Sequence, residues 1–296
     1  MDYLEGSLLD VRKGINESNT ERIGENTEVL YKHIEKLRKR DYSGFKKFGF
    51  RDLDAATGGM ENGELVVVSA PEKSGKTTML LQILMRNALD GVPSLLFSQE
   101  MSIRQIKIRY AVMQSGVDYV SFVNGRLSNE EWHKIYEVIE GWKNLPIFIN
   151  ENMYSILDIR ADIQSQINVN KIGLVAVDYI QIILPPEKKR IMSRQEEVAM
   201  ISRTLKTLAK ENKVPVLALS QVNEDGKTRE SRAIQHDLDK LITWEKNENK
   251  EGLSGFEVPL KIVQRMGSGS SGQVKLWYKT DTGTFGNINH TEPPIF

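Results

Sequence analysis

The stretch ELVVVSAPEKSGKTT at residues 64–78 decides the fold of this chain. Its first half is a run of apolar and β-branched residues, which predicts a buried β-strand. Its second half contains a short loop that ends at Gly75, and the periodic apolar residues that follow predict a helix. A buried strand that passes through such a loop into a helix is the setting of a P-loop.

A P-loop binds phosphate with backbone N–H groups, a helix amino terminus, a lysine and a hydroxyl group. Lys76 supplies the ammonium for the β and γ oxygens, and Thr77 supplies a hydroxyl for magnesium. Ala70 stands where the general pattern has its first glycine, at a position that calls for a small side chain. The predicted nucleotide-binding residues are Ala70, Pro71, Glu72, Lys73, Ser74, Gly75, Lys76, Thr77 and Thr78.

Strand-like and helix-like segments alternate along most of the chain, which predicts an α/β fold. The strand-like segments are residues 64–69, 94–98, 147–150, 172–177 and 215–219. Such alternation indicates a mainly parallel sheet covered by helices on both faces. Three further segments, at 241–244, 258–264 and 273–278, are separated by polar or Gly/Ser-rich stretches and predict an antiparallel extension of the sheet edge.

Residues 1–42 lack the alternating strand-like and helix-like segments of residues 43–296, which predicts a helical arm followed by one large domain. The arm carries two short apolar stripes at helical spacing, which are Leu4, Leu8, Val11 and Ile15, and then Leu30, Ile34 and Leu37. Short amphipathic helices bury little by themselves. The stripes therefore need the main domain, a neighbouring subunit or another protein to pack against.

Composition excludes several classes of function. The 40 basic and 40 acidic side chains cancel, so any contact with nucleic acid must be local. The chain has no cysteine, which excludes disulfides, thiolate metal sites and a catalytic thiol. It has no signal-like start and no run of about 18 apolar residues, so we expect a cytoplasmic protein without a membrane partner.

Polar residues follow three of the predicted strands. Ligands of parallel sheets bind at the carboxyl ends of the strands, where Asp178, Glu100 and Gln221 are expected. Asp178 suits a magnesium site, Glu100 could accept a proton from an attacking water, and Gln221 could sense the γ-phosphate. Each also has a structural interpretation, as a cap, a helix-start carboxylate or a surface amide.

Five segments together resemble the RecA-like motor domain of DnaB-family replicative helicases. Besides the P-loop, they are FRDLDAATGG (50–59), FSQEMS (97–102), VDYIQ (177–181), ISRTLKTLAKE (201–211) and VPVLALSQ (214–221). The resemblance runs from about residue 48 to 278. It implies an ATP-driven, Mg²⁺-dependent helicase motor that works as a homohexameric ring and moves 5′ to 3′ on single-stranded DNA.

The resemblance also implies roles for single residues. It assigns Lys76 and Thr77 to phosphate and magnesium, Asp178 to the metal, Glu100 to general base and Gln221 to γ-phosphate sensing. Arg265, in VQRMG (263–267), is similar to the family's arginine finger, which acts in the ATP site of the adjacent subunit. Val263 replaces the lysine that the family usually has there.

The segment TRESR (228–232) is similar to the family's central-channel loop, which implies DNA contacts for Arg229, Glu230 and Arg232. The basic segment PPEKKR (185–190) is a second candidate loop for phosphate contacts. His236 replaces a residue of the family pattern, and we interpret it as a structural position. A solvated loop is the plain alternative for both charged segments.

Full-length members of the family have a folded amino-terminal collar that binds primase, and nothing of that size precedes Phe48 here. We therefore expect either a minimal helicase, as in a virus or mobile element, where the host cytoplasm would be its location, or a longer protein cut down to its motor. A primase or a helicase loader are the candidate partners. Two other functions stay open, a recombination-type RecA-like ATPase and a non-motor, ATP-gated loader or interaction protein.

Overall fold

The computed structural model describes residues 22–39, 41, 43–186, 192–222, 234, 236–245, 255–264 and 272–288. The chain divides into two compact units, Met1–Ser43 and Gly44–Phe296. The first predicted apolar stripe of the arm lies outside the described residues.

The first unit contains helix α2 (Thr27–Arg38), which includes the second predicted stripe. No residue of this helix is buried. Leu30, Ile34 and Leu37 keep 56%, 49% and 41% of their surface exposed. The helix forms, but its apolar face is left without cover in the described part of its unit.

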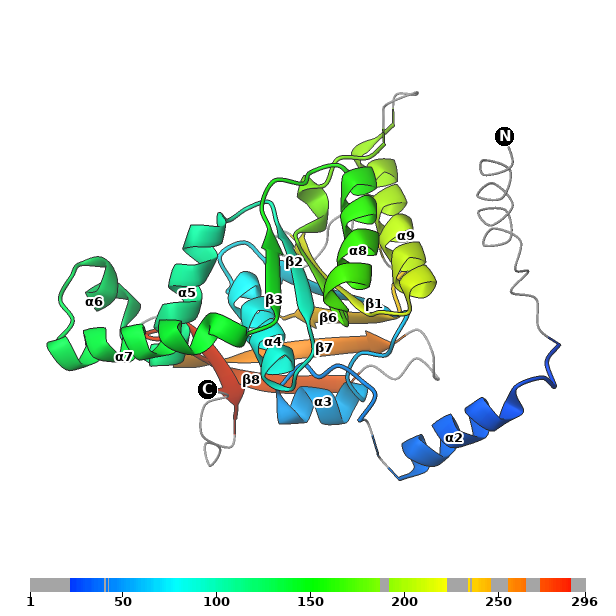
Figure 1. Ribbon diagram of the computed structural model, residues 1–296, viewed down its shortest axis with the longest axis horizontal. Helices are drawn as coiled ribbons and strands as arrows, with labels where there is room; N and C mark the ends of the chain where they lie inside the picture. The colour runs from blue at the N-terminus through cyan, green and yellow to red at the C-terminus, as the bar shows by residue number, and fades with distance from the viewer. Residues whose placement is uncertain are drawn as a thin grey trace, which may run out of the picture. The chain divides into compact units, whose positions relative to one another are not determined.

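The second unit is built on one nine-stranded sheet of order β3-β2-β4-β5-β1-β6-β7-β8-β9 (Figure 1). Its strands are β1 (Leu65–Pro71), β2 (Ser94–Ser98), β3 (Ile147–Asn150), β4 (Leu174–Asp178), β5 (Val216–Val222), β6 (Lys240–Trp244), β7 (Gly255–Gln264), β8 (Gly272–Lys279) and β9 (Thr284–Asn287). Its helices are α3 (Arg51–Thr57), α4 (Lys76–Leu89), α5 (Ile103–Ser115), α6 (Tyr119–Val123), α7 (Asn129–Glu140), α8 (Ile156–Asn170) and α9 (Arg194–Asn212), with 3-10 turns η1 (Gly141–Asn144) and η2 (Ile180–Ile182).

The sheet confirms the predicted parallel core and corrects one strand direction. Strands β1 to β5 pair in parallel, whereas β7, β8 and β9 continue the sheet in antiparallel pairs. The segment 241–244 was expected to begin the antiparallel extension, which is wrong, because β6 runs parallel to β1. Because β5 and β6 both run parallel to β1, β6 begins at the sheet edge opposite to the one where β5 ends.

Alternate residues of the central strands pack into two separate hydrophobic cores, one on each face of the sheet. In β1, Val66 and Val68 face the core that contains α4, while Leu65 and Val67 face the core that contains α8 and α9. Side chains alternate between the two faces of a strand, so a continuous apolar run is what a sheet covered on both sides demands. Helices α8 and α9 lie side by side on their face (Figure 1).

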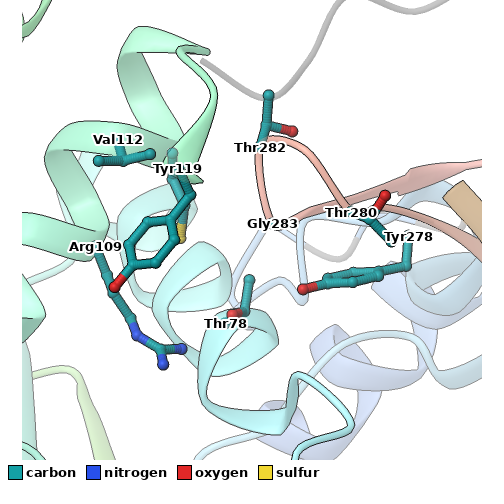
Figure 2. A pocket seen from close by; sticks show the side chains of 9 residues that line it. Thr78, Arg109, Val112, Tyr119, Tyr278, Thr280, Thr282 and Gly283 are labelled. Atoms are coloured by element: carbon teal, nitrogen blue, oxygen red, sulfur yellow. The ribbon is translucent and has the colours of Figure 1, made fainter. Parts of the chain in front are cut away.

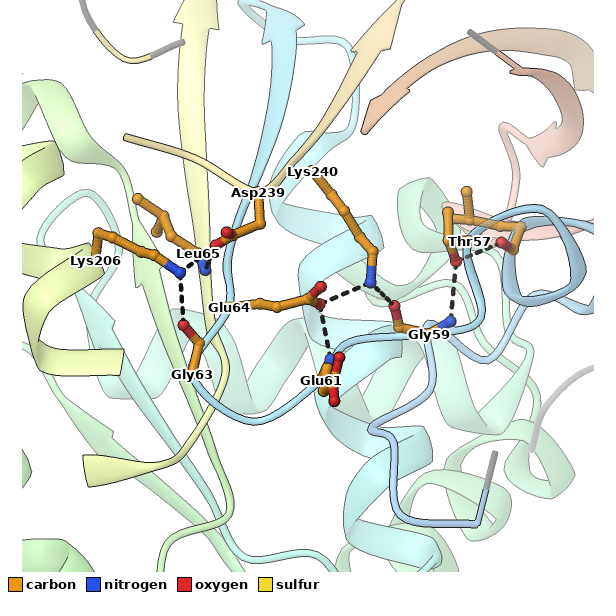
Figure 3. A network of polar contacts seen from close by, with 10 residues as sticks. Thr57, Gly59, Glu61, Gly63, Glu64, Leu65, Lys206, Asp239 and Lys240 are labelled. Atoms are coloured by element: carbon orange, nitrogen blue, oxygen red, sulfur yellow. Dashed lines mark hydrogen bonds and ion pairs between the residues drawn. The ribbon is translucent and has the colours of Figure 1, made fainter. Parts of the chain in front are cut away.

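The amino end of β1 is fixed by two lysine ammonium groups (Figure 3). Lys206 donates to the carbonyl of Gly63 at 2.8 Å and to Asp239 Oδ2 at 2.7 Å. Lys240 donates to Glu64 Oε2 at 2.7 Å and to the carbonyl of a glycine in the preceding turn at 2.8 Å. These lysine–carboxylate pairs hold the amino ends of β1 and β6 together. The loop at the carboxyl end of β1 therefore starts from a strand that is fixed at its other end.

Candidate nucleotide-binding site

The predicted site residues meet at the carboxyl edge of the sheet because of strand register. Ser98 pairs with Asp178, so Glu100, two residues further, lies next to the end of β4. Ala70 pairs with Gln221, which brings the end of β5 beside the P-loop. Parallel strands thus collect at one edge four segments that lie far apart in the sequence.

The loop after β1 has the backbone geometry of an anion-binding turn. Lys73 and Gly75 adopt positive φ angles of 56° and 96°. At Gly75 a Cβ would lie 3.3 Å from Phe285 Cζ, so both the left-handed backbone and the close approach favour glycine. Ser74 Oγ donates to the carbonyl of Pro71 at 2.6 Å within the loop. Helix α4 begins at Lys76, and its amino terminus therefore faces the loop.

Thr77 and Asp178 form a direct pair from two different elements. Thr77 Oγ1 donates to Asp178 Oδ2 at 2.8 Å. Asp178 is only 1% exposed, and its second oxygen, Oδ1, is buried and has no hydrogen-bond partner among the described residues. A hydroxyl beside a buried carboxylate oxygen that lacks a partner is a donor set that suits a hard cation such as Mg²⁺.

Burial raises the pKa of Asp178 to about 6, and the nearby Glu100 carboxylate also raises it. The Thr77 hydrogen bond and the charges of Lys76 and Arg109 lower this pKa but do not cancel the cost of burial. The ionised form of Asp178 is therefore costly at this buried position and would be stabilised by a cation.

Lys76 and Glu100 face each other across the site. Lys76 Nζ lies 3.9 Å from Glu100 Oε2, with the lysine side chain 5% exposed and the glutamate 45% exposed. The ammonium also lies 5.2 Å from the ring centroid of Tyr179. Lys76 is thus held at the buried base of the site, while the Glu100 carboxylate is open to water.

Gln181, which the sequence-based roles did not include, fixes the end of β5. Its Oε1 accepts from the Gln221 backbone N–H at 3.3 Å, and its Nε2 donates to the Gln221 carbonyl at 3.1 Å. The same Nε2 donates to Ser220 Oγ at 2.9 Å. Gln181 follows Asp178 by three residues, so it joins the segment after β4 to the main chain of Gln221.

A pocket of about 160 Å³ opens beside the P-loop helix (Figure 2). Figure 2 shows Arg109 and Tyr119 on one side, Thr78 on α4 at the base and Tyr278 on the other side. The turn after β8 completes the wall with Thr280, Thr282 and Gly283. Of these residues, only Thr78 was predicted from the sequence, because the walls come from α5, α6 and the β8–β9 hairpin.

Several predicted residues lie outside the described part of the chain. These are Arg229, Glu230 and Arg232 of the proposed DNA loop, the finger candidate Arg265, and the basic residues of 187–190. Within the described residues, no helix is long and apolar enough to cross a membrane.

Comparison with known proteins places this site in a family. The family model described as DnaB-like helicase C terminal domain matches residues 46–287. The replicative DNA helicase DnaB of Mycoplasma pneumoniae is 32% identical over 315 residues, which cover 96% of this chain and 66% of that protein. The chain spans 55% to 66% of the length of the first two curated relatives that it matches.

Two solved structures share the fold. One, described as an ATPase domain, superimposes with a TM-score of 0.79 at 25% identity, covering 90% of this chain and 100% of that one. A DnaB-like replicative helicase, described together with its interactions with primase, gives a TM-score of 0.79 at 24% identity, covering 94% and 71% of the two chains. These matches confirm the predicted RecA-like α/β fold. Because its family model spans most of the chain and includes every strand of the described sheet, the protein belongs to the DnaB-like helicase C-terminal domain family.

Proposed function

We propose that this chain is the ATP-hydrolysing motor of a replicative DNA helicase, with residues 43–296 as the motor domain and residues 1–42 as an arm. The proposal rests above all on the four side chains at one sheet edge, Lys76, Thr77, Asp178 and Glu100. Each has the chemistry that its position in a phosphate-hydrolysing site requires.

The buried groups bind and orient, and the exposed group moves a proton. Thr77 Oγ1 and Asp178 Oδ1, which lacks a partner among the described residues, would hold Mg²⁺, which when bound neutralises charge on the β and γ phosphates. Lys76 Nζ, near the base of the site, would bind the same phosphates. The Glu100 carboxylate would accept a proton from the attacking water.

Glu100 is available for this role because another residue caps the following helix. The N-cap of α5 is Ser102, whose hydroxyl and backbone form a capping box with Gln105. Glu100 is therefore not needed to cap α5, which removes the interpretation of Glu100 as a helix-start carboxylate. Its 45% exposure gives it contact with solvent water.

The pocket of Figure 2 suits the base of the nucleotide. A nucleotide whose phosphates lie on the loop 72–75 would have its base near Thr78, between Arg109 and Tyr278. A guanidinium group and an aromatic ring are both planar groups that stack on a purine. We therefore assign adenine to this pocket.

Ring assembly and DNA binding extend the proposal. Arg265 would complete the ATP site of the neighbouring subunit in a homohexamer, and Arg229, Glu230 and Arg232 would contact single-stranded DNA in the central channel. Apolar side chains suited to subunit contacts are exposed on α2 and, in the motor unit, at Val120, Val123 and Tyr136, which are 63%, 62% and 60% exposed. We further propose a cytoplasmic protein, of a host cell if the source is a virus, that works with a primase or a loader.

The test is ATP hydrolysis measured against protein concentration, with and without single-stranded DNA, while light scattering follows assembly size in the same samples. We expect Mg²⁺-dependent turnover that rises steeply as hexamers form and that DNA stimulates. The Glu100→Gln variant is the control, because it should bind ATP without turning it over. Turnover that is indifferent to DNA and to concentration, or none at all, would favour an ATP-gated binding protein instead.

A further inference from the structure

Gln82 is a buried amide in the middle of the P-loop helix, only 1% exposed. Its Oε1 accepts from the Phe285 backbone N–H at 2.7 Å, and its Nε2 donates to the Phe285 carbonyl at 3.1 Å. The side chain thus binds both polar groups of one residue in β9. An amide side chain offers one donor and one acceptor, as a peptide group of a neighbouring strand would.

This pairing secures the last strand of the described sheet. Phe285 lies opposite Tyr278 of β8 in the antiparallel register. Its N–H and carbonyl bind Gln82, so they point away from β8. Gln82 therefore takes the place of a further strand beyond β9 and links β9 directly to α4.

The same link reaches the pocket assigned above to adenine. Thr78 and Gln82 are four residues apart and lie on one face of α4. Thr78 lines the pocket, and the Phe285 ring lies 4.7 Å from the ring of Tyr278, which forms the opposite wall. The turn 280–283 between these strands is tied on its other side by the Tyr119 N–H, which donates to the Asp281 carbonyl at 3.1 Å.

We propose that Gln82 is a positioning residue that holds the β8–β9 wall of the pocket at the distance from α4 that a purine base requires. This inference rests on the proposed nucleotide-binding function. Gly75 lies close to the Phe285 ring, so the loop 72–75 is not wholly separate from this wall. The phosphate side of the site should still depend on Gln82 less than the base pocket does, because the loop starts from β1, which is paired on both sides, and carries its own Ser74–Pro71 hydrogen bond.

The test is calorimetric binding of two probes, Mg·ADP and inorganic Mg·tripolyphosphate, to the full chain and its variants. Gln82→Met keeps the length of the side chain and removes both hydrogen bonds. We expect it to bind Mg·ADP about tenfold more weakly. The loss of roughly one net hydrogen bond would leave the wall correctly placed in only about one molecule in ten, and the apparent affinity falls by that fraction. Its affinity for Mg·tripolyphosphate should change by no more than about twofold, as for an independent site.

Asn87 provides a matched control on the same helix. It is also a buried amide, and its Nδ2 donates to the carbonyl of Lys47 at 2.7 Å, away from the pocket. Asn87→Leu should lower the stability of the protein without changing the affinity for either probe. A specific effect of Gln82 is thereby separated from a general loss of stability.

A second variant keeps the test decisive if Gln82→Met does not fold. In Gln82→Glu the side chain can donate and accept only when its carboxyl group is protonated, and burial favours that neutral form. The ADP affinity of this variant, divided by that of the wild type at the same pH, should be near one at about pH 5.5 and fall at about pH 8.

Wild-type ADP affinity in Gln82→Met, or an equal loss of ADP and tripolyphosphate, would overturn the positioning role, and so would a pH-independent ratio in Gln82→Glu. Failure of the wild type to bind either probe would instead refute the nucleotide-binding function itself.

Discussion

Replacement of Asp178 by asparagine should make the metal-free protein more stable relative to the wild type as the pH rises, while it weakens Mg·nucleotide binding. Burial raises the pKa of Asp178 from 3.8 to about 6. A folded-state pKa above the unfolded value means that the folded protein binds the proton more tightly, so stability is lost as the pH rises from about 4 to about 6. The full effect of this shift is about 3 kcal/mol of unfolding free energy, of which about half is already lost at pH 5.

The asparagine of the variant would carry no charge at any pH, so the variant escapes this loss. We expect the unfolding free energy of Asp178→Asn minus that of the wild type to grow by about 1 to 2 kcal/mol between pH 5 and pH 8. Any fixed cost of the new amide cancels in this change, and so does the titration of Asp54, whose pKa burial also raises to about 6 in both proteins.

The assay is urea unfolding in EDTA, followed by tryptophan fluorescence, at pH values from about 5 to about 8. A difference between the two proteins that stays constant with pH, or shrinks as the pH rises, would refute the reasoning from burial. Calorimetry with Mg·ADP at the alkaline end of this range supplies the functional half of the prediction, since a variant that is more stable and binds as tightly as the wild type would remove Asp178 from the metal site.

Three other predictions concern turnover, assembly and DNA. Hydrolysis should be lost in Arg265→Ala, by about 10³-fold, and also in Lys76→Ala. A mixture of the two variants should recover activity, because the intact Arg265 of one subunit would act on the intact P-loop of its neighbour. An inactive mixture would contradict action in trans. Arg229→Ala combined with Arg232→Ala should reduce the slope of log affinity for single-stranded DNA against log salt by about two, as fluorescence anisotropy would show, and an unchanged slope would place these residues off the DNA path. Gln181→Leu should lower kcat about tenfold without changing the Kd for Mg·ADP, because it releases the Gln221 main chain and leaves the P-loop intact; an unchanged kcat would contradict this.

The residues at strand ends could be predicted from the sequence because the parallel sheet itself gathers them. Once residues 64–69, 94–98, 172–177 and 215–219 are recognised as parallel strands, their following polar residues must lie at one edge. The structure brings Lys76, Thr77, Asp178 and Glu100 together in this way. The direction of β6 was predicted wrongly because an apolar run indicates a buried strand but not whether that strand is parallel or antiparallel to its neighbour.

Other contacts depend on tertiary packing that no local pattern encodes. Arg109 lies on α5, and the spacing of apolar residues in that helix does not predict that the β8–β9 hairpin, far away in the sequence, lies opposite it. Gln181 acts on the backbone of Gln221, and any residue could supply a backbone group. Gln82 did leave a signal, because it interrupts an otherwise apolar stretch, MLLQILM at residues 79–85, and a buried amide needs partners.

The two ends of β1 show how structural and functional charges can be told apart in this chain. At the amino end, Lys206 and Lys240 each lie 2.7 Å from a carboxylate oxygen, and each also donates to a backbone carbonyl. At the carboxyl end, Asp178 keeps a buried oxygen with no partner among the described residues, and Lys76 Nζ lies 3.9 Å from the Glu100 carboxylate. Paired charges need nothing further, whereas a buried carboxylate of raised pKa beside a loosely paired lysine remains costly until a ligand completes it. We therefore expect a magnesium-bound triphosphate to recover on binding the free energy that the buried Asp178 carboxylate costs.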